Sequence, residues 1–132
     1  MARQHYETLQ EVFDDAYRGL AAQGFRRSIH IPQIGVTKPS CAYVSADGCR
    51  CAIGHLMTSD EITRFGHVVA PVEELMAYQD FHQKLADAAS AEDLDQLQEA
   101  HDLSQTSDDM QERLRLYAVA HGLTIPSIGG AA

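Results

Sequence analysis

Apolar residues recur three or four positions apart in the first part of the chain, and this spacing is typical of one face of an α-helix. The residues on that face are Tyr6, Leu9, Phe13, Ala16, Tyr17 and Leu20. The acidic residues Glu7, Glu11 and Asp14 fall mostly on the other faces. Gly24 follows, and glycine adopts without strain the left-handed conformation that ends many helices. The pattern predicts an amphipathic N-terminal helix that ends near Gly24.

The pattern changes between residues 41 and 53, where two short apolar runs flank an Asp-Gly pair. Asp47-Gly48 between such runs is typical of a β-hairpin, because Gly accepts the positive φ that the turn requires. In that hairpin Cys41 would lie opposite Ile53, and strand alternation would place all three cysteines on one face. Residues 25–40 contain two prolines, so we expect one short strand there at most, followed by a loop.

The remaining pattern predicts four or so helices. Thr58 is followed by Glu61 three positions later, which fits a capping box for a short helix. The next helix is expected to break near Gln79, and Gly122 is expected to stop the last one. The residues expected at the starts of these helices are Thr58, Pro71, Ser90 and Ser107.

These elements together predict an α+β fold that is mostly helical. It would have an N-terminal helix, one β-hairpin at about residues 41–53, and four or so helices packed on the hairpin. Residues 1–123 are expected to form a single globular domain. Residues 124–132 are small and polar enough to form a flexible C-terminal tail.

The charge of the chain narrows its possible partners. The 132 residues include 10 Lys and Arg against 19 Asp and Glu, a formal net charge of −9. Nucleic-acid binders draw affinity from neutralising phosphates, so we expect no nucleic-acid partner, and the same repulsion disfavours an anionic membrane. No apolar run reaches the roughly 18 residues of a membrane span. We therefore expect a cytoplasmic protein, whose odd number of cysteines stays reduced.

The acidic residues are densest between residues 87 and 112, a stretch that contains no Lys or Arg. Such runs are usually solvated helix faces, and Asp108 and Asp109 also offset a helix dipole. The functional alternative is a docking surface for a protein partner with a basic surface. The residues of that surface would be Asp87, Glu92, Asp93, Asp95, Glu99, Asp102, Asp108, Asp109 and Glu112.

Three cysteines and a histidine lie within fifteen residues and raise the question of zinc. The candidate ligands would be Cys41, Cys49, Cys51 and His55. Their spacing fits none of the usual Cys-x₂₋₄-Cys patterns. In the hairpin, Cys41 and Cys49 would be about 13 Å apart along the ladder. We expect buried structural thiols with no metal or cofactor, and a zinc site remains the open alternative.

Catalytic groupings are sparse. Cys51 and His55 could meet if a helix began at Cys51, and Asp102 could orient His101, although neighbouring helix residues point to different faces. Nothing in the sequence indicates a lowered thiol pKa. The chain also lacks the phosphate-loop, dinucleotide-binding, His-Glu-x-x-His and Gly-x-Ser-x-Gly motifs. We assign no catalytic residue and leave a small Cys/His enzyme as a further alternative.

Several segments resemble a group of small phage and prophage proteins to which no activity is assigned. The likeness lies in Cys41-Ala-Tyr-Val, in Asp47-Gly48-Cys-Arg-Cys51-Ala-Ile-Gly54-His55-Leu56, in Leu97-Gln-Glu-Ala-His-Asp102 and in His121-Gly-Leu123. It covers about residues 41–123 in separate pieces. The chain departs from the group's pattern at Val44, where the group often has Arg, and by its extra Cys49. The resemblance implies an origin in a mobile element.

The function that these observations favour is a non-enzymatic protein-interaction factor of phage or prophage type. It would act in the cytoplasm of a bacterial host, where it would bind and modulate a host protein through its acidic surface. Inhibition of a host defence system is one such role. The alternatives are a zinc-stabilised structural domain and a small Cys/His enzyme.

Overall fold

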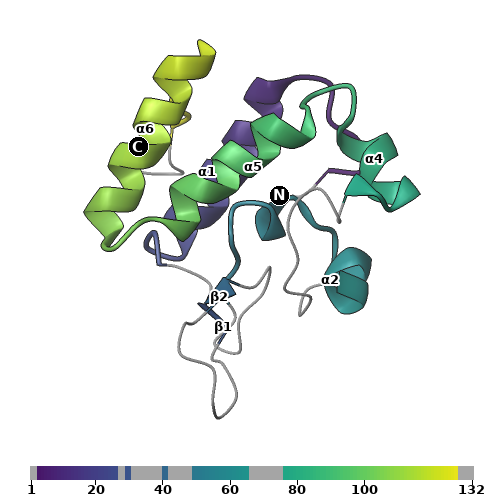
Figure 1. Cartoon of the computed structure of the whole chain (residues 1–132), viewed down its shortest axis with the longest axis horizontal. Coiled ribbons are helices and arrows are strands. Elements are labelled where there is room, and N and C mark those ends of the chain that lie inside the picture. Colours follow the sequence, from purple (N-terminus) through teal and green to yellow (C-terminus); the bar gives the residue numbers. More distant parts are fainter. Residues whose placement is uncertain (1–2, 27–28, 31–39, 42–48, 66–75, 128–132) are drawn as a thin grey trace.

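The computed structural model describes residues 3–26, 29–30, 40–41, 49–65 and 76–127, and helices dominate this part of the chain (Figure 1). The elements in chain order are α1 (Leu9–Ala22), β1 (Ile29–His30), β2 (Ser40–Cys41), the 3₁₀ helix η1 (Gly54–Leu56), α2 (Ser59–Phe65), α4 (Gln79–Leu85), α5 (Ala91–Asp102) and α6 (Ser107–His121).

The predicted β-hairpin at residues 41–53 is wrong. Cys41 belongs to β2, which pairs antiparallel with β1, so Cys41 lies opposite Ile29 and not opposite Ile53. Each of these strands is two residues long. Residues 42–48, which include the Asp-Gly pair, lie outside the described residues. The described chain is therefore all-α rather than α+β with a hairpin.

The expected second strand of the hairpin is a helical turn instead. Ile53 has φ −70° and ψ −33°, which are helical values. The N–H of His55 donates to the carbonyl of Cys51 at 3.1 Å, as in one turn of an α-helix. The N–H of Ile53 donates to the side chain of Gln98 at 3.1 Å, so it is not available to a neighbouring strand.

The N-terminal helix forms as predicted, because its end signals are local. Thr8 caps α1 in a reciprocal capping box with Glu11. At the other end Gly24 has φ +73°, the left-handed conformation expected there. The N–H of Phe25 then donates to the carbonyl of Leu20 at 2.8 Å, which closes the helix in a Schellman-type turn.

Most of the other predicted helix boundaries are also confirmed. Thr58 and Glu61 form the expected box ahead of α2. Ser90 caps α5 together with Asp93. The break near Gln79 is present, since the preceding residue is extended and α4 starts at Gln79. The expected helix start at Pro71 lies outside the described residues.

The start of α6 differs from the prediction by one residue. Its N-cap is Thr106, whose hydroxyl accepts the N–H of Asp109 at 3.0 Å, and Ser107 is the first helical residue. Gly122 ends the helix in the left-handed conformation, as expected. Beyond it, Thr124 is bonded to α1, because its N–H donates to Oε1 of Gln10 at 3.0 Å. Residues 128–132 lie outside the described residues.

The core is organised around residues 49–57, an irregular segment that runs from β2 towards α2 through the middle of the molecule (Figure 1). Its buried members are Cys49, Cys51, Ala52, Ile53, Gly54, Leu56 and Met57. Five of them, Cys51, Ala52, Ile53, Leu56 and Met57, belong to one apolar cluster with side chains such as Phe13 and Leu20 of α1, Phe81 of α4 and Leu94 of α5. The cysteine-bearing segment is thus the interior of the protein.

A buried segment without regular secondary structure must still pair its backbone polar groups. Long side chains from three helices meet this need. Gln23, directly after α1, accepts the N–H of Arg50 at 3.0 Å and donates to its carbonyl at 2.7 Å. Gln98 of α5 accepts from Ile53, as described above. Lys84 of α4 donates to the carbonyl of Leu56.

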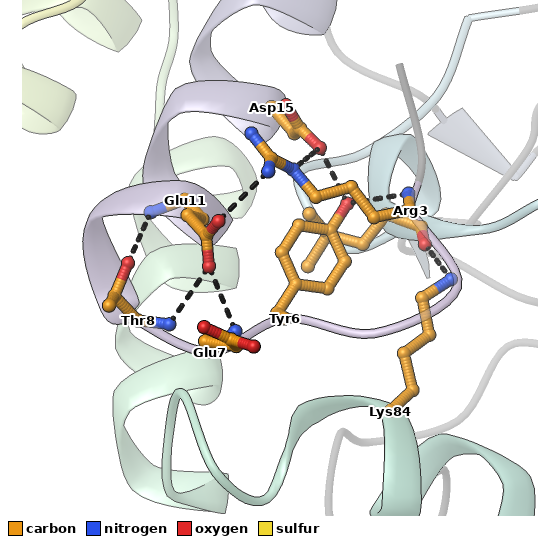
Figure 2. A network of polar contacts seen from close by, with 8 residues as sticks. Arg3, Tyr6, Glu7, Thr8, Glu11, Asp15 and Lys84 are labelled. Atoms are coloured by element: carbon orange, nitrogen blue, oxygen red, sulfur yellow. Dashed lines mark hydrogen bonds and ion pairs between the residues drawn. The ribbon is translucent and has the colours of Figure 1, made fainter.

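The residues that precede α1 are held by a polar network around Tyr6, as Figure 2 shows. Tyr6 is fully buried, and its hydroxyl donates to Asp15 at 2.8 Å. Arg3 donates to the same carboxylate at 3.2 Å and to Glu11 at 2.9 Å. The N–H of Tyr6 donates to the carbonyl of Lys84 at 2.9 Å. Burial, and then the bond to Asp15, raise the pKa of the Tyr6 hydroxyl.

We predict that Gly19→Ala destabilises the protein through a single contact. A Cβ at position 19 would overlap the imidazole ring of His55, which packs against α1 at this point. Overpacking of this kind costs about 1–3 kcal/mol, measured as the free energy of unfolding in urea. In a His55→Ala background the same change should cost nothing, or stabilise the helix by about 0.5–1 kcal/mol. Equal costs in both backgrounds would disprove the contact.

Candidate functional site

Helices α5 and α6 form an antiparallel pair joined by residues 103–106, and an open groove of about 300 Å³ runs along their outer seam. The α5 side of the groove carries residues at i, i+3, i+4 and i+7. The α6 side has the same kind of spacing. The groove is lined by Gln96, Glu99, Ala100, Leu103, Arg113, Leu116, Tyr117, Ala120 and His121.

The groove combines a packed floor with exposed apolar walls. Ala100 and Tyr117 are each only 7% exposed, whereas Leu103 is 56% and Leu116 is 53% exposed. Val119, one turn along α6 from Leu116, is 67% exposed. Large apolar side chains gathered on one face of a protein mark interaction sites more often than scattered ones do.

One end of the groove is held by ring stacking and hydrogen bonds. His121 stacks on Tyr117 with ring centroids 4.1 Å apart, and its Nε2 pairs with Oε1 of Gln96 at 3.1 Å. Tyr117 in turn stacks on Phe13 of α1 at 5.8 Å and donates to the carbonyl of Asp93 at 2.9 Å. These contacts fix the wall of the groove before any partner binds.

An acidic stripe lies beside the groove on α5. Glu92, Asp95, Glu99 and Asp102 follow one another at spacings of three, four and three, so they share one face of the helix. Among the described residues, Asp95 and Glu99 are exposed and have no cationic partner. Glu92 only accepts a long bond of 3.4 Å from Gln96. Within the described residues, Asp95 and Glu99 are thus the members of this stripe whose charge is left uncompensated, whereas Asp102 is bonded to His101 and Gln98.

Asp109 and Glu112 of α6 behave differently, because arginines one turn along the helix neutralise them. Asp109 accepts from Arg113 at 3.1 Å and from the N–H of Gln105 at 2.9 Å, and these bonds hold its pKa below the usual range. Glu112 pairs with Arg115, which lowers the pKa of Glu112 in the same way. The predicted acidic surface is therefore not uniform.

The remaining predicted acidic residues have positions of their own. Asp93 completes the capping box at the start of α5. Asp87 lies 3.0 Å from Nε2 of His5, a residue 82 positions earlier in the chain. Asp108 is exposed in the first turn of α6, where negative charge offsets the helix dipole.

The cysteines that the structure describes in full are buried. Cys49 is 2% and Cys51 0% exposed. Burial raises the pKa of the Cys51 thiol to about 12, and its sulfur accepts the N–H of Gly54 at 3.3 Å. His55 lies one helical turn away, but its Nε2 pairs with Gln23 at 2.9 Å. The side chains of Cys51 and His55 are therefore bonded to different groups.

His101 and Asp102 do contact each other, contrary to the expectation that adjacent helix residues diverge. Nδ1 of His101 lies 2.8 Å from the Asp102 carboxylate, which also accepts from Gln98 at 2.7 Å. His101 is fully buried. Gln98 also accepts the N–H of Ile53, so this chain of contacts ties the end of α5 to the core. The buried imidazole of His101 is not open to a substrate.

The structure gives no support to a metal centre within its described part. There, no group of three or more His, Cys, Asp or Glu side chains lies close enough to hold a metal ion. The side chain of Cys41, one of the four zinc candidates, lies outside this description.

A second hollow, of about 440 Å³, lies between the N-terminal segment, α2 and α4. Three of its charged or titratable groups have partners: Lys84 pairs with Glu61 at 2.6 Å, and His5 with Asp87. Burial lowers the pKa of Lys84, and the pairing with Glu61 opposes this effect. The bond between Lys84 and Glu61 holds α4 to α2, and Asp60 is exposed at the edge of the hollow.

Two further findings concern the chain as a whole. Within the described residues, none of the helices combines the length and the apolar character that crossing a lipid bilayer requires. Comparisons with protein-family models, with curated proteins and with solved structures returned no match.

We predict that His55 makes stability depend on pH. Burial, and then the charges of Arg50 and His101, lower the pKa of His55 from 6.5 to about 4. The unfolded chain therefore binds more protons between these values, and the free energy of unfolding falls as the pH drops from about 6.5 to 4, by about 1–3 kcal/mol. Urea titrations across this range should show a flatter slope for His55→Gln. The exposed His82→Gln should match the parent protein, and an equally steep slope in His55→Gln would contradict the prediction.

We also predict that Cys51 resists alkylation while the protein is folded, because the thiol is buried and protonated at neutral pH. Iodoacetamide treatment at pH 8 followed by mass spectrometry of the peptides should find Cys51 unmodified in native protein and modified in urea. Equal labelling in both conditions would show that the thiol is accessible.

Proposed function

We propose that this chain is a non-enzymatic protein-interaction factor that binds a partner with a basic surface through the α5–α6 face. The observation that carries the proposal is the juxtaposition on this face of exposed Leu103 and Leu116 with the uncompensated carboxylates Asp95 and Glu99. Apolar side chains supply affinity to an interface, and complementary charge supplies its specificity and association rate.

The charge of the whole chain favours the same class of partner. A net charge of −9 attracts basic surfaces over distances of about a Debye length, roughly 8 Å at physiological salt. It repels nucleic acids and anionic membranes. The titratable Cys51 and His101 are buried, so an enzyme that relies on them would have no route for substrate.

The resemblance to phage and prophage proteins supports a host protein as the partner. A factor of this kind would act in the cytoplasm of a bacterial host and modulate the protein that it binds. Inhibition of a defence system is one form that such modulation takes.

The proposal predicts that binding depends on the α5 stripe. Tagged protein is used to capture partners from a bacterial lysate, and the captured proteins are identified by mass spectrometry. Each candidate partner is then purified, and its affinity for this chain is measured by calorimetry. Asp95→Asn with Glu99→Gln should weaken binding of a true partner about tenfold at low salt. The matched control, Glu7→Gln with Asp60→Asn, removes two exposed charges elsewhere and should change the affinity less than about twofold. Equal effects of the two double variants, or no basic protein retained, would overturn the proposal.

A further inference from the structure

We infer that the occupant of the α5–α6 groove is an amphipathic α-helix of the partner, with its apolar stripe on the groove and its Lys and Arg side chains along the α5 wall. This inference rests on the proposed function and specifies how the same face is used. Three observations carry it: the shape of the groove, the small residues within it, and the different charges of its two walls.

The shape of the groove matches a helix. Each wall is a stripe of positions that spans about seven or eight residues of a straight helix, or about 11 Å at 1.5 Å per residue. Two parallel ridges of this length accept two to three turns of a third helix. Such a ligand presents apolar anchors at i, i+3 or i+4, and i+7.

Small residues create the hollow. Both helices contribute an alanine to the groove: Ala100 of α5 lies in its floor, and Ala120 of α6 is exposed. Larger side chains at these positions would fill the seam and leave the two helices with a smooth outer face. The hollow is therefore the part of the surface where an apolar side chain from a partner gains most contact.

The two walls differ in charge. The α5 wall has the carboxylate Glu99, with Asp95 one turn away, whereas on the α6 wall Arg113 is paired with Asp109 at 3.1 Å. A bound helix is therefore oriented, because its cations are attracted to the α5 wall more strongly than to the neutralised α6 wall. A second copy of this chain is disfavoured as occupant, because it would bring another surface of net charge −9.

The groove is also preorganised. His121, Tyr117 and Phe13 form a continuous stack that anchors the floor to α1. These side chains are therefore already ordered before a partner binds, which reduces the entropic cost of association.

The inference is tested with a synthetic peptide rather than with an unidentified partner. The probe is a fluorescent helix of about 14 residues, roughly four turns, with Leu at i, i+3 and i+7 and Lys along one flank only. Two control peptides have the same length: one with Glu in place of Lys, and one with the same composition in scrambled order. Fluorescence anisotropy should show binding of the first peptide, and at least tenfold weaker binding of both controls.

Groove-filling variants of the full chain locate the site. Ala120→Phe should weaken binding of the basic peptide at least tenfold, because it occupies the hollow without changing the charge. Ala22→Phe, at an exposed alanine on α1, is the matched control and should bind like the parent protein. The parent protein should bind the peptide with Lys on one flank more tightly than a peptide with Lys on both flanks. Arg113→Glu should remove this difference in affinity. Circular dichroism checks that each variant is folded. If Ala120→Phe is not folded, Leu116→Asp is used in its place.

The outcomes separate this inference from the proposed function. If Ala120→Phe leaves peptide binding unchanged, or the scrambled peptide binds equally well, the helix-in-groove inference is wrong. If the purified partner still loses affinity through Asp95→Asn with Glu99→Gln, the proposed function stands without it. If neither the groove variant nor the charge variant affects any partner, both are wrong.

Discussion

Residues 49–57 enter the core without forming a strand or a long helix, and their backbone groups must find partners away from water. The protein meets this requirement with three long side chains that arrive from different parts of the chain: Gln23 at Arg50, Gln98 at Ile53 and Lys84 at Leu56. An unpaired buried amide or carbonyl costs about 1–3 kcal/mol, so the positions of α1, α4 and α5 are coupled through this one segment. The helices enclose residues 49–57 rather than pack on a hairpin.

This arrangement decides which chemistry reaches the surface. Cys51 and His101 face inward and serve the core, where burial keeps the thiol protonated. One face of α5 is buried against residues 49–57 and α6, and its opposite face carries the acidic stripe. The groove between α5 and α6 faces outward beside these carboxylates. The interaction surface that we propose is thus a consequence of how the core is closed.

The parts of the fold that could be predicted from sequence are those fixed by local chemistry. The capping pairs at Thr58 and Ser90 and the left-handed Gly24 involve residues a few positions apart. The hairpin could not be judged in this way, because the groups that decide the conformation of residues 50–53 are up to 45 positions away, as for Ile53 and Gln98. The acidic run was visible in the sequence, and the arginines that pair with Asp109 and Glu112 lie only four and three positions further along the same helix. The groove depends on how α5 and α6 pack against each other, because both helices contribute its lining residues, Ala100 and Ala120 among them.

Native-state hydrogen exchange at the amides of Ile53 and Gly54 is the measurement that tests this account most directly. If residues 49–57 are the closed centre of the core, both amides exchange only through global unfolding, with an opening free energy equal to the value from urea denaturation. An opening free energy more than about 2 kcal/mol below that value would identify a locally mobile loop. That result would contradict the account, because a segment that opens on its own could not fix the positions of α1, α4 and α5.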